Sequence, residues 1–175
     1  METLACTAPE IVLARIGAET ARIRIGAGGI MLPHYSAFKV AEVFRTLEAL
    51  YPWRVDLGIG RAPGGGPVEA LALKRDRGTK MADDFPDQAA ELLAYLDGDS
   101  GDHRFPAGHP FASLRVSPEP EGAPDVWMLG SSLWSSAAAA EFGLPYAFAH
   151  FFFGMGTREA IEGYQRGFTA SSRRA

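Results

Sequence analysis

Arg61 stands at a position where a cation could bind a ligand. It follows the alternating stretch at residues 54–60 and precedes a loop rich in glycine and proline. In parallel α/β folds the carboxyl ends of strands carry the ligand sites, and a guanidinium there can form two hydrogen bonds to one phosphate. A salt bridge to a carboxylate of the loop explains the same residue about as well, so both interpretations stay open on the local sequence.

A run of serines marks a second candidate phosphate site. Ser131, Ser132 and Ser135 follow the strand-like residues 125–129 and open a segment with helical periodicity. A helix start offers free backbone N–H groups and a partial positive charge, and both favour an anion. Capping of the helix by a serine hydroxyl is the commoner reason for such a residue. The pattern alone therefore leaves phosphate binding and capping as alternatives.

Other chemistries find little support in the sequence. Gly58, Gly60 and Gly64 have the spacing G-x-G-x-x-x-G, and Pro63 stands where a nucleotide-binding helix should begin, which argues against a nicotinamide dehydrogenase. The chain contains no G-x-S-x-G elbow, so a hydrolase nucleophile is not expected. Its four histidines and the single Cys6 show no metal-ligand spacing, and we predict no metal site.

Composition places the chain among ordinary globular proteins. It has 175 residues, a hydrophobic share of 47% and a charged share of 22%, which exclude a disordered chain. The net charge of −4 and the lack of a basic block argue against nucleic acid as a partner. No apolar run approaches the ~20 residues of a membrane span. A single cysteine and an amino-terminal sequence without signal-peptide features predict a cytoplasmic protein.

Strand and helix patterns alternate along the chain. Strands are expected at residues 22–32, 54–60, 125–129 and 145–149, and helices at 9–20, 36–51, 69–73, 84–96, 132–142 and 157–168. Residues 98–122 show no period and are expected to form a surface insertion. This alternation predicts a parallel sheet, either open and doubly wound or part of a barrel. Glycines that alternate with Ile and Leu in two strands favour the barrel, because sheets buried on both faces are usually continuously apolar.

Several ordered stretches resemble the bacterial luciferase-like monooxygenase family. They lie at residues 24–34, 39–52, 54–64, 126–135 and 143–150, and the resemblance is weakest at residues 98–122. The resemblance implies a (β/α)8 TIM barrel that uses reduced FMN, or a deazaflavin in some branches, and O2 to oxygenate a small organic substrate. It also implies a flavin reductase as the source of reduced flavin, and barrels that pair into homo-oligomers.

The same resemblance implies flavin-binding residues at six positions: Gly28, Gly29, Arg61, Ser131, Ser132 and Ser135. The arginine matches a family residue that contacts the flavin phosphate, and the serines lie on the matching helix start. The two glycines match a pair joined by a non-proline cis peptide bond beside the isoalloxazine ring. No catalytic residue is assigned by the resemblance.

The chain carries fewer strands than the implied barrel. A whole barrel has eight strand–helix units and typically ~250 residues, whereas four strands are expected here. The first two strands of the family, with their histidine-bearing segment, and its last two strands have no counterpart in these 175 residues. We therefore expect one domain at residues 1–175 that is an internal part of a longer protein, incomplete at both ends. The expected function is a flavin-dependent monooxygenase, and the alternative is a non-catalytic flavin-binding or partner subunit, or an inactive fragment.

Overall fold

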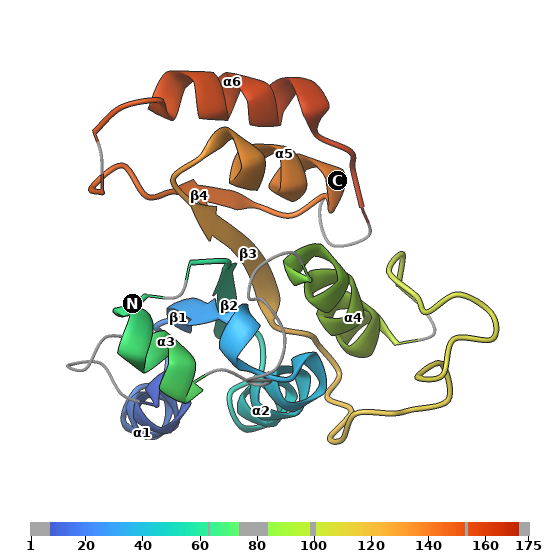
Figure 1. The fold of residues 1–175 in the computed structure, drawn as a ribbon. Coiled ribbons are helices and arrows are strands. Elements are labelled where there is room, and N and C mark those ends of the chain that lie inside the picture. The colour runs from blue at the N-terminus through green and yellow to red at the C-terminus, as the bar shows by residue number, and fades with distance from the viewer. Residues whose placement is uncertain (1–7, 63, 74–83, 99–100, 153, 172–175) are drawn as a thin grey trace.

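The computed structural model describes residues 8–62, 64–73, 84–98, 101–152 and 154–171. Within these residues four strands form one sheet in the order β1-β2-β3-β4, and every neighbouring pair is parallel (Figure 1). The strands are β1 Ile25–Met31, β2 Val55–Gly60, β3 Asp125–Gly130 and β4 Tyr146–Phe148. The predicted parallel sheet is confirmed, and sequential strands lie next to each other throughout it.

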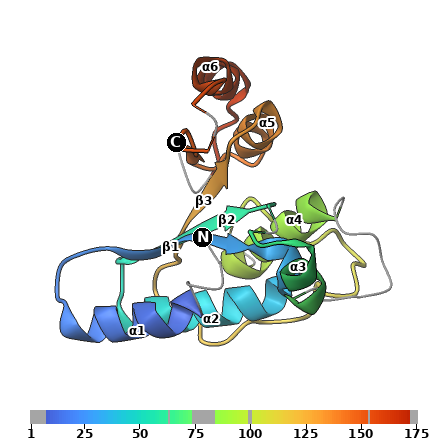
Figure 2. The ribbon, with the colours of Figure 1, turned by 60° about the vertical axis from the view of Figure 1, so that its left-hand side comes forward.

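Helices separate the strands along the chain. Their bounds are α1 Pro9–Glu19, α2 Ala37–Leu50, α3 Pro67–Leu73, α4 Phe85–Asp97, α5 Leu133–Glu141 and α6 Thr157–Gly167, with a short 3-10 helix η1 at Leu32–His34. Helices α1 and α2 lie beside β1 and β2, and α5 and α6 pack beside β3 and β4 (Figures 1 and 2). None of the described helices has both the length and the apolar character that a bilayer crossing requires.

The two faces of the sheet differ, as the alternating strand sequences predicted. Val55, Leu57 and Ile59 of β2 are almost fully buried in the hydrophobic core, together with residues of the helix layer. The intervening positions on this strand are occupied by Asp56, Gly58 and Gly60. One face of β2 therefore packs on helices, and the opposite face carries the small and polar residues.

The buried residues of α2 and α4 recur at helical spacing. Val40, Phe44 and Leu47 of α2 are buried, and so are Leu92 and Leu93 of α4. Because apolar residues spaced three and four apart share one side of a helix, these side chains form a continuous stripe toward the core.

Helix α1 packs differently from the spacing of its large apolar residues. Val12 and Ile16 are exposed, whereas Leu13 and Gly17 are buried. The ring of Tyr51 occupies the space next to Gly17, where a Cβ atom would lie 2.5 Å from the ring. The hydroxyl of Tyr51 also donates a hydrogen bond of 2.6 Å to the carbonyl of Ala14. The helix therefore approaches its neighbours through small residues and a tyrosine that comes later in the chain.

The described residues between α4 and β3 contain no helix or strand, in agreement with their period-free sequence. Arg45 of α2 fastens this segment, because its guanidinium donates hydrogen bonds of 3.0 Å to the carbonyl of Val116 and 2.9 Å to that of Tyr95. His103 adds a second attachment through bonds to the carboxylate of Asp97 at 2.8 Å and the carbonyl of Phe142 at 3.2 Å. The segment is thus held against α2, α4 and the end of α5.

Candidate functional site

The carboxyl ends of the strands bring the predicted flavin residues to one edge of the sheet. Arg61 directly follows β2, and Ser131 directly follows β3. Gly28 pairs with Gly58, and Met31, the last residue of β1, pairs with Gly60. At about 3.3 Å per residue, the glycine pair lies roughly 7–10 Å along β1 from the strand end. Because the strands are parallel, these residues share one edge of the sheet.

The two glycines of β1 have different surroundings. Their peptide bond is cis, as the family resemblance implied. A Cβ atom on Gly29 would lie 2.5 Å from the carbonyl oxygen of Gly58 and 2.6 Å from Cδ1 of Leu129, so this position admits glycine alone. A Cβ atom on Gly28 would meet no heavy atom within 4 Å. The backbone at Gly28 is therefore bare and open to a flat ligand.

Arg61 lies over the indole ring of Trp134 near the start of α5. Its guanidinium carbon is 4.3 Å from the ring centroid, which is the geometry of a cation–π contact. Trp134 in turn packs edge-on against Phe85, the first residue of α4, with ring centroids 5.7 Å apart. Across the described part of the chain no carboxylate forms an ion pair with Arg61. The contact thus holds the cation beside the serine-rich helix start and leaves its charge available.

Sequence reasoning did not select Trp134, although its neighbours Ser131, Ser132 and Ser135 were chosen. The available signal was a large aromatic residue within the first turn of a helix that begins at a strand end. Such a residue reaches back toward the sheet edge, because helical side chains point toward the helix N-terminus.

Two of the serines cap helix α5. The hydroxyl oxygen of Ser132 accepts a hydrogen bond of 3.3 Å from the amide of Ser135, and the Ser135 hydroxyl oxygen accepts one of 3.4 Å from the amide of Ser132. Ser135 also donates to the carbonyl of Ser132 at 2.8 Å and is 3.1 Å from the hydroxyl of Tyr146. The capping alternative is therefore realised in the structure. Phosphate binding by these hydroxyls stays a prediction.

Tyr146, the first residue of β4, contacts this cap through its hydroxyl. Burial raises the pKa of its phenol, and the hydrogen bond between this phenol and the Ser135 hydroxyl acts in the opposite direction and is the smaller effect. A Cβ atom on Gly130 would overlap the side chain of Ser135, so the end of β3 can close onto the cap only as glycine. The helix start is consequently a rigid structure fixed by β3 and β4.

The amino ends of the strands carry an ion-pair network instead of a ligand site. Arg24 donates to both carboxylate oxygens of Asp56, at 2.9 and 2.8 Å, and to Asp125 at 2.7 Å. The hydrogen bond to Asp56 is the main reason why the pKa of Arg24 is raised, and burial partly opposes it. The indole N–H of Trp127 donates to the same carboxylate at 3.0 Å. These charges are paired with one another.

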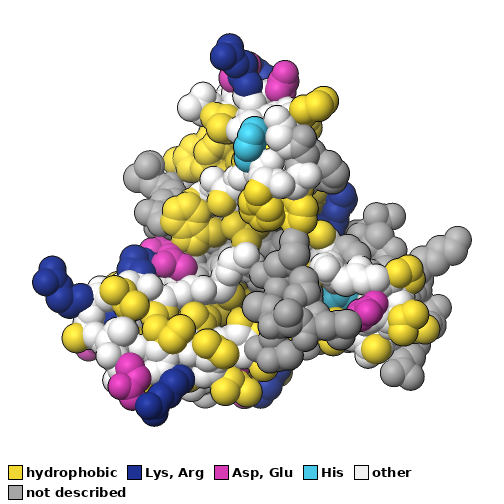
Figure 3. Space-filling model, turned by 90° about the vertical axis from the view of Figure 1, so that its left-hand side faces the viewer, with side chains coloured by type: hydrophobic (Ala, Val, Ile, Leu, Met, Phe, Trp, Pro, Cys, Tyr) yellow, Lys and Arg dark blue, Asp and Glu magenta, His cyan; other side chains and the backbone are white. Residues whose placement is uncertain are grey.

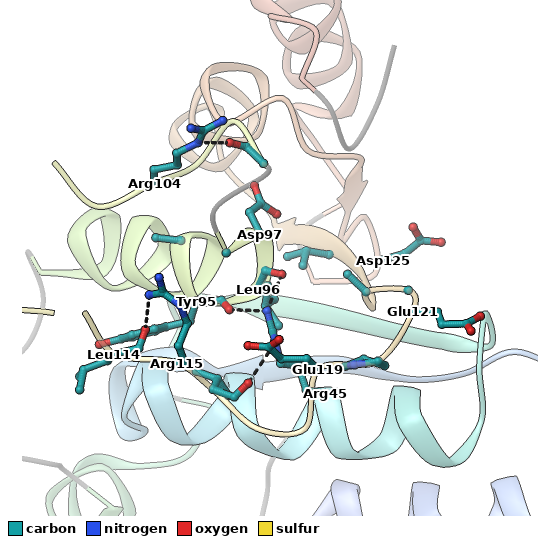
Figure 4. A pocket seen from close by; sticks show the side chains of 18 of the residues that line it. Arg45, Tyr95, Leu96, Asp97, Arg104, Leu114, Arg115, Glu119, Glu121 and Asp125 are labelled. Carbon is teal, nitrogen blue, oxygen red and sulfur yellow. Dashed lines mark hydrogen bonds between the residues drawn. The ribbon is translucent and has the colours of Figure 1, made fainter. Parts of the chain in front are cut away.

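An open hollow of about 990 Å³ lies near these amino ends, away from the predicted site. Figure 4 shows that three of its arginines already bind backbone carbonyls: Arg45, Arg104 and Arg115. No three or more His, Cys, Asp or Glu side chains within the described ranges gather as metal ligands. We therefore assign the candidate site to the carboxyl ends of the strands.

Known proteins are similar to this chain in sequence and in fold. Residues 1–175 match the family model described as Luciferase-like monooxygenase. The uncharacterised protein YwcH of Bacillus subtilis (strain 168) is 50% identical over 96% of this chain, and the match covers 49% of YwcH. The crystal structure of apo-MsnO8 has a TM-score of 0.83 at 48% identity, over 97% of this chain and 47% of that chain. The chain thus spans about half the length of the relatives that it matches.

More distant structures share the fold at lower identity. One is the oxygenating constituent of 3,6-diketocamphane monooxygenase of Pseudomonas putida in complex with FMN, at 20% identity and a TM-score of 0.62, over 91% of this chain and 48% of that chain. Another is an F420-dependent secondary alcohol dehydrogenase in complex with an F420-acetone adduct. It has 18% identity and a TM-score of 0.62, over 90% of this chain and 48% of that chain. The predicted fold class, α/β with part of a (β/α)8 barrel, is confirmed by these matches. On the family match over all of its residues, the chain belongs to the luciferase-like monooxygenase family.

Proposed function

We propose that the carboxyl edge of this sheet holds a reduced flavin in a flavin-dependent monooxygenase that oxygenates an organic substrate with O2. The single observation that carries the proposal is the meeting of three features at one edge: the bare backbone at Gly28, the cation of Arg61 and the start of α5. The family match supports the same activity.

The chemistry of these residues fits the two ends of a flavin. Arg61 can give two hydrogen bonds to a phosphate, and the amides of Leu133 and Trp134 have no intrahelical acceptor in the first turn of α5. Ser131 precedes these residues directly in the chain, while Ser132 and Ser135 shape the helix start through the cap. The open space at Gly28 admits the edge or face of a planar ring.

A bound reduced flavin supplies the electrons and the reaction with oxygen, and the protein positions it and excludes water. Arg61 and the helix start orient the phosphate, which fixes the distance at which the ring reaches the glycine pair. Leu129 lies over Gly29 and Gly58 and makes this part of the sheet apolar. These residues thus bind and orient the flavin, and no proton transfer is assigned to them.

Reduced FMN is the flavin that we propose, with a deazaflavin as the alternative. One structural relative was solved with FMN and another with an F420 adduct, so the fold accommodates both chemistries. A flavin reductase is the proposed source of reduced flavin, and the cytoplasm is the proposed compartment. A non-catalytic flavin-binding subunit would use the same site, and oxygenation of an organic substrate by the purified chain with reduced FMN and O2 distinguishes the two functions.

Substitution of Arg61 tests the proposed site. We expect Arg61→Ala to weaken flavin binding by roughly 10- to 150-fold, since a charge-assisted hydrogen bond contributes about 1.5–3 kcal/mol. Arg22→Ala is the matched control, because Arg22 is also exposed but precedes β1 at the opposite end of the sheet. Flavin fluorescence quenching measures both affinities. Equal affinities for the two variants would remove Arg61 from the site and refute the proposal.

A further inference from the structure

We infer that Trp134 is a positioning residue that aims the guanidinium of Arg61 at the phosphate of the flavin. The inference rests on the proposed function, and it adds a residue that makes the site prefer a phosphorylated flavin to an uncharged one. Trp134 lies in the first turn of α5, and the guanidinium carbon of Arg61 is 4.3 Å from the centroid of its indole ring. The ring therefore acts on the flavin through Arg61 and does not need to touch it.

The indole ring of Trp134 meets both ends of the connection from β2 to α4. Arg61 is the first residue after β2, and Phe85 is the first residue of α4. Phe85 is fully buried, and its ring packs edge-on against the indole with centroids 5.7 Å apart. Aromatic pairs in this arrangement stabilise each other beyond the area that they bury. The guanidinium of Arg61 is thus attached to a ring that is itself fixed in the core.

A second arginine on an aromatic ring shows what a structural contact looks like in this protein. The guanidinium carbon of Arg54 is 5.8 Å from the centroid of the Tyr51 ring. Its N–H groups donate to the carbonyls of Ile23 and Thr20 and to the hydroxyl of Thr20. Among the described residues none accepts a hydrogen bond from the guanidinium of Arg61. An aromatic ring attracts a cation without supplying an oxygen acceptor, so the N–H donors of Arg61 are left for a phosphate.

Preorganisation is the physical reason why the contact should affect binding. An arginine side chain loses rotamer freedom when it binds a ligand, and this loss opposes binding. A side chain that is already held near its binding position loses less. Because Trp134 holds the cation without using its hydrogen-bond donors, it reduces this loss and leaves the phosphate contact intact.

The cations on the carboxyl side of the sheet are isolated from one another. Helix α3 and the connection from β4 to α6, which follow carboxyl ends of strands, lie on the left-hand side of Figure 1. Figure 3 faces that side, and the Lys and Arg side chains that it shows stand apart and form no basic cluster. A phosphate at this edge therefore depends on how well a single cation is aimed.

Ordinary core packing is the rival role for Trp134. The residue is partly buried and packs against the hydrophobic core, so its loss could simply loosen the start of α5. The two roles differ in what they predict for riboflavin, which has the isoalloxazine ring of FMN and no phosphate. A positioning role affects FMN alone, whereas a packing role affects both flavins.

Binding of FMN and of riboflavin to the 175-residue chain, measured by quenching of flavin fluorescence, tests the inference. Trp134→Leu should weaken FMN binding by roughly 5- to 30-fold, the range for loss of a partly shielded cation–π contact, and riboflavin binding by less than about twofold. Trp134→Phe keeps an aromatic face and should hold FMN affinity within about threefold of the unsubstituted chain. Equal losses for both flavins in Trp134→Leu would overturn the inference. So would a Trp134→Phe protein that binds FMN no better than Trp134→Leu.

Two further variants show whether the effect passes through Arg61. Trp53→Leu is the matched control, because Trp53 is 64% exposed and precedes β2 at the opposite end of the sheet, and it should change neither affinity. Adding Trp134→Leu to Arg61→Ala should change FMN affinity by less than about twofold, since residues that act through one contact are not additive. A full further loss in the double variant would overturn the inference, because Trp134 would then act without Arg61.

Inorganic phosphate, titrated by phosphorus NMR on the same variants, separates this inference from the proposed function. A chain that binds phosphate through Arg61 and Trp134 but binds neither flavin refutes the proposed function and supports the positioning role. A chain that binds FMN as tightly after Trp134→Leu as before refutes the positioning role alone. A chain that binds neither flavin nor phosphate refutes both.

Discussion

Substitution of two adjacent glycines of β1 should have two different effects: Gly29 is needed for the packing of the sheet, and Gly28 leaves space for the proposed flavin. In Gly29→Ala the new methyl would lie 2.5 Å from the carbonyl oxygen of Gly58 and 2.6 Å from Leu129 Cδ1. The leucine can rotate, but the carbonyl belongs to the neighbouring strand and cannot move without disturbing the sheet. Overpacking of this kind costs about 1–3 kcal/mol. For a chain of this size that lowers Tm by roughly 2–12 °C.

Gly28→Ala is expected to leave the stability of the fold almost unchanged and to weaken flavin binding. Its methyl meets no heavy atom within 4 Å, so the free energy of unfolding should change by no more than about 1 kcal/mol, in the stabilising direction if at all. The methyl would instead occupy the space that the proposed flavin ring needs. We expect flavin affinity to fall by at least about tenfold, since a displaced ring also loses its apolar contact with the sheet.

Thermal unfolding by circular dichroism and flavin fluorescence quenching, measured on both variants, complete the test. The expected result is a stable Gly28→Ala protein that binds flavin weakly and a destabilised Gly29→Ala protein. Wild-type flavin affinity in Gly28→Ala would refute the placement of the ring. A Tm for Gly28→Ala as low as that of Gly29→Ala would refute the reasoning from free space.

Three further predictions concern the support of the site. Ser132→Ala should lower the free energy of unfolding by about 1 kcal/mol, because it removes the N-cap hydrogen bond from the amide of Ser135, with flavin affinity unchanged within about twofold. Urea unfolding and flavin titration check this, and weaker flavin binding at unchanged stability would contradict it. The pKa of Tyr146 is raised from 10.0, because burial in the folded state favours the protonated phenol. The contribution of this phenol to the free energy of unfolding is therefore complete below pH 10.0. It is lost as the pH rises through the folded-state pKa. Urea unfolding across that range should show a smaller alkaline loss in Tyr146→Phe. Arg24→Met should lower the free energy of unfolding by about 1–2 kcal/mol. The loss is this small because the ion pairs of Arg24 with Asp56 and Asp125 are partly exposed to solvent. Thermal unfolding should show almost no effect of the control Arg15→Met, whose ion pair on α1 is solvated.

The local sequence pattern predicted the strands and most helices, because buried residues recur at every second position of a strand and every three to four positions of a helix. The alternation of Val55, Leu57 and Ile59 with smaller or polar residues identified β2 and its buried face. The same reasoning did not show which side of α1 packs, because Val12 and Ile16 have helical spacing and yet are exposed. The packed side of α1 is fixed by a tyrosine after α2, and no period within α1 contains that information.

The candidate site was predictable where it depends on strand direction. Arg61 and Ser131 each follow a strand of the predicted parallel sheet, and parallel strands end at one edge. The contact of Arg61 with Trp134 and the bond of Ser135 to Tyr146 were not predictable, since each joins residues of different strand–helix units. The cis bond at Gly28 was expected from the family resemblance and had no local signature apart from the glycines themselves.

The face of the sheet that carries Asp56 and Gly58 is charged at the amino ends of the strands and apolar toward their carboxyl ends. At the amino ends the single cation of Arg24 pairs with the carboxylates of both Asp56 and Asp125 through short hydrogen bonds. Toward the carboxyl ends Gly58 and Leu129 make the surface small and apolar, and residues 131–157 contain a single formally charged side chain, Glu141. An uncharged surrounding strengthens each remaining electrostatic contact, because fewer charges and less water compete with it. The exposed guanidinium of Arg61, unpaired within the described residues, is therefore suited to an anionic group such as the flavin phosphate proposed for this edge.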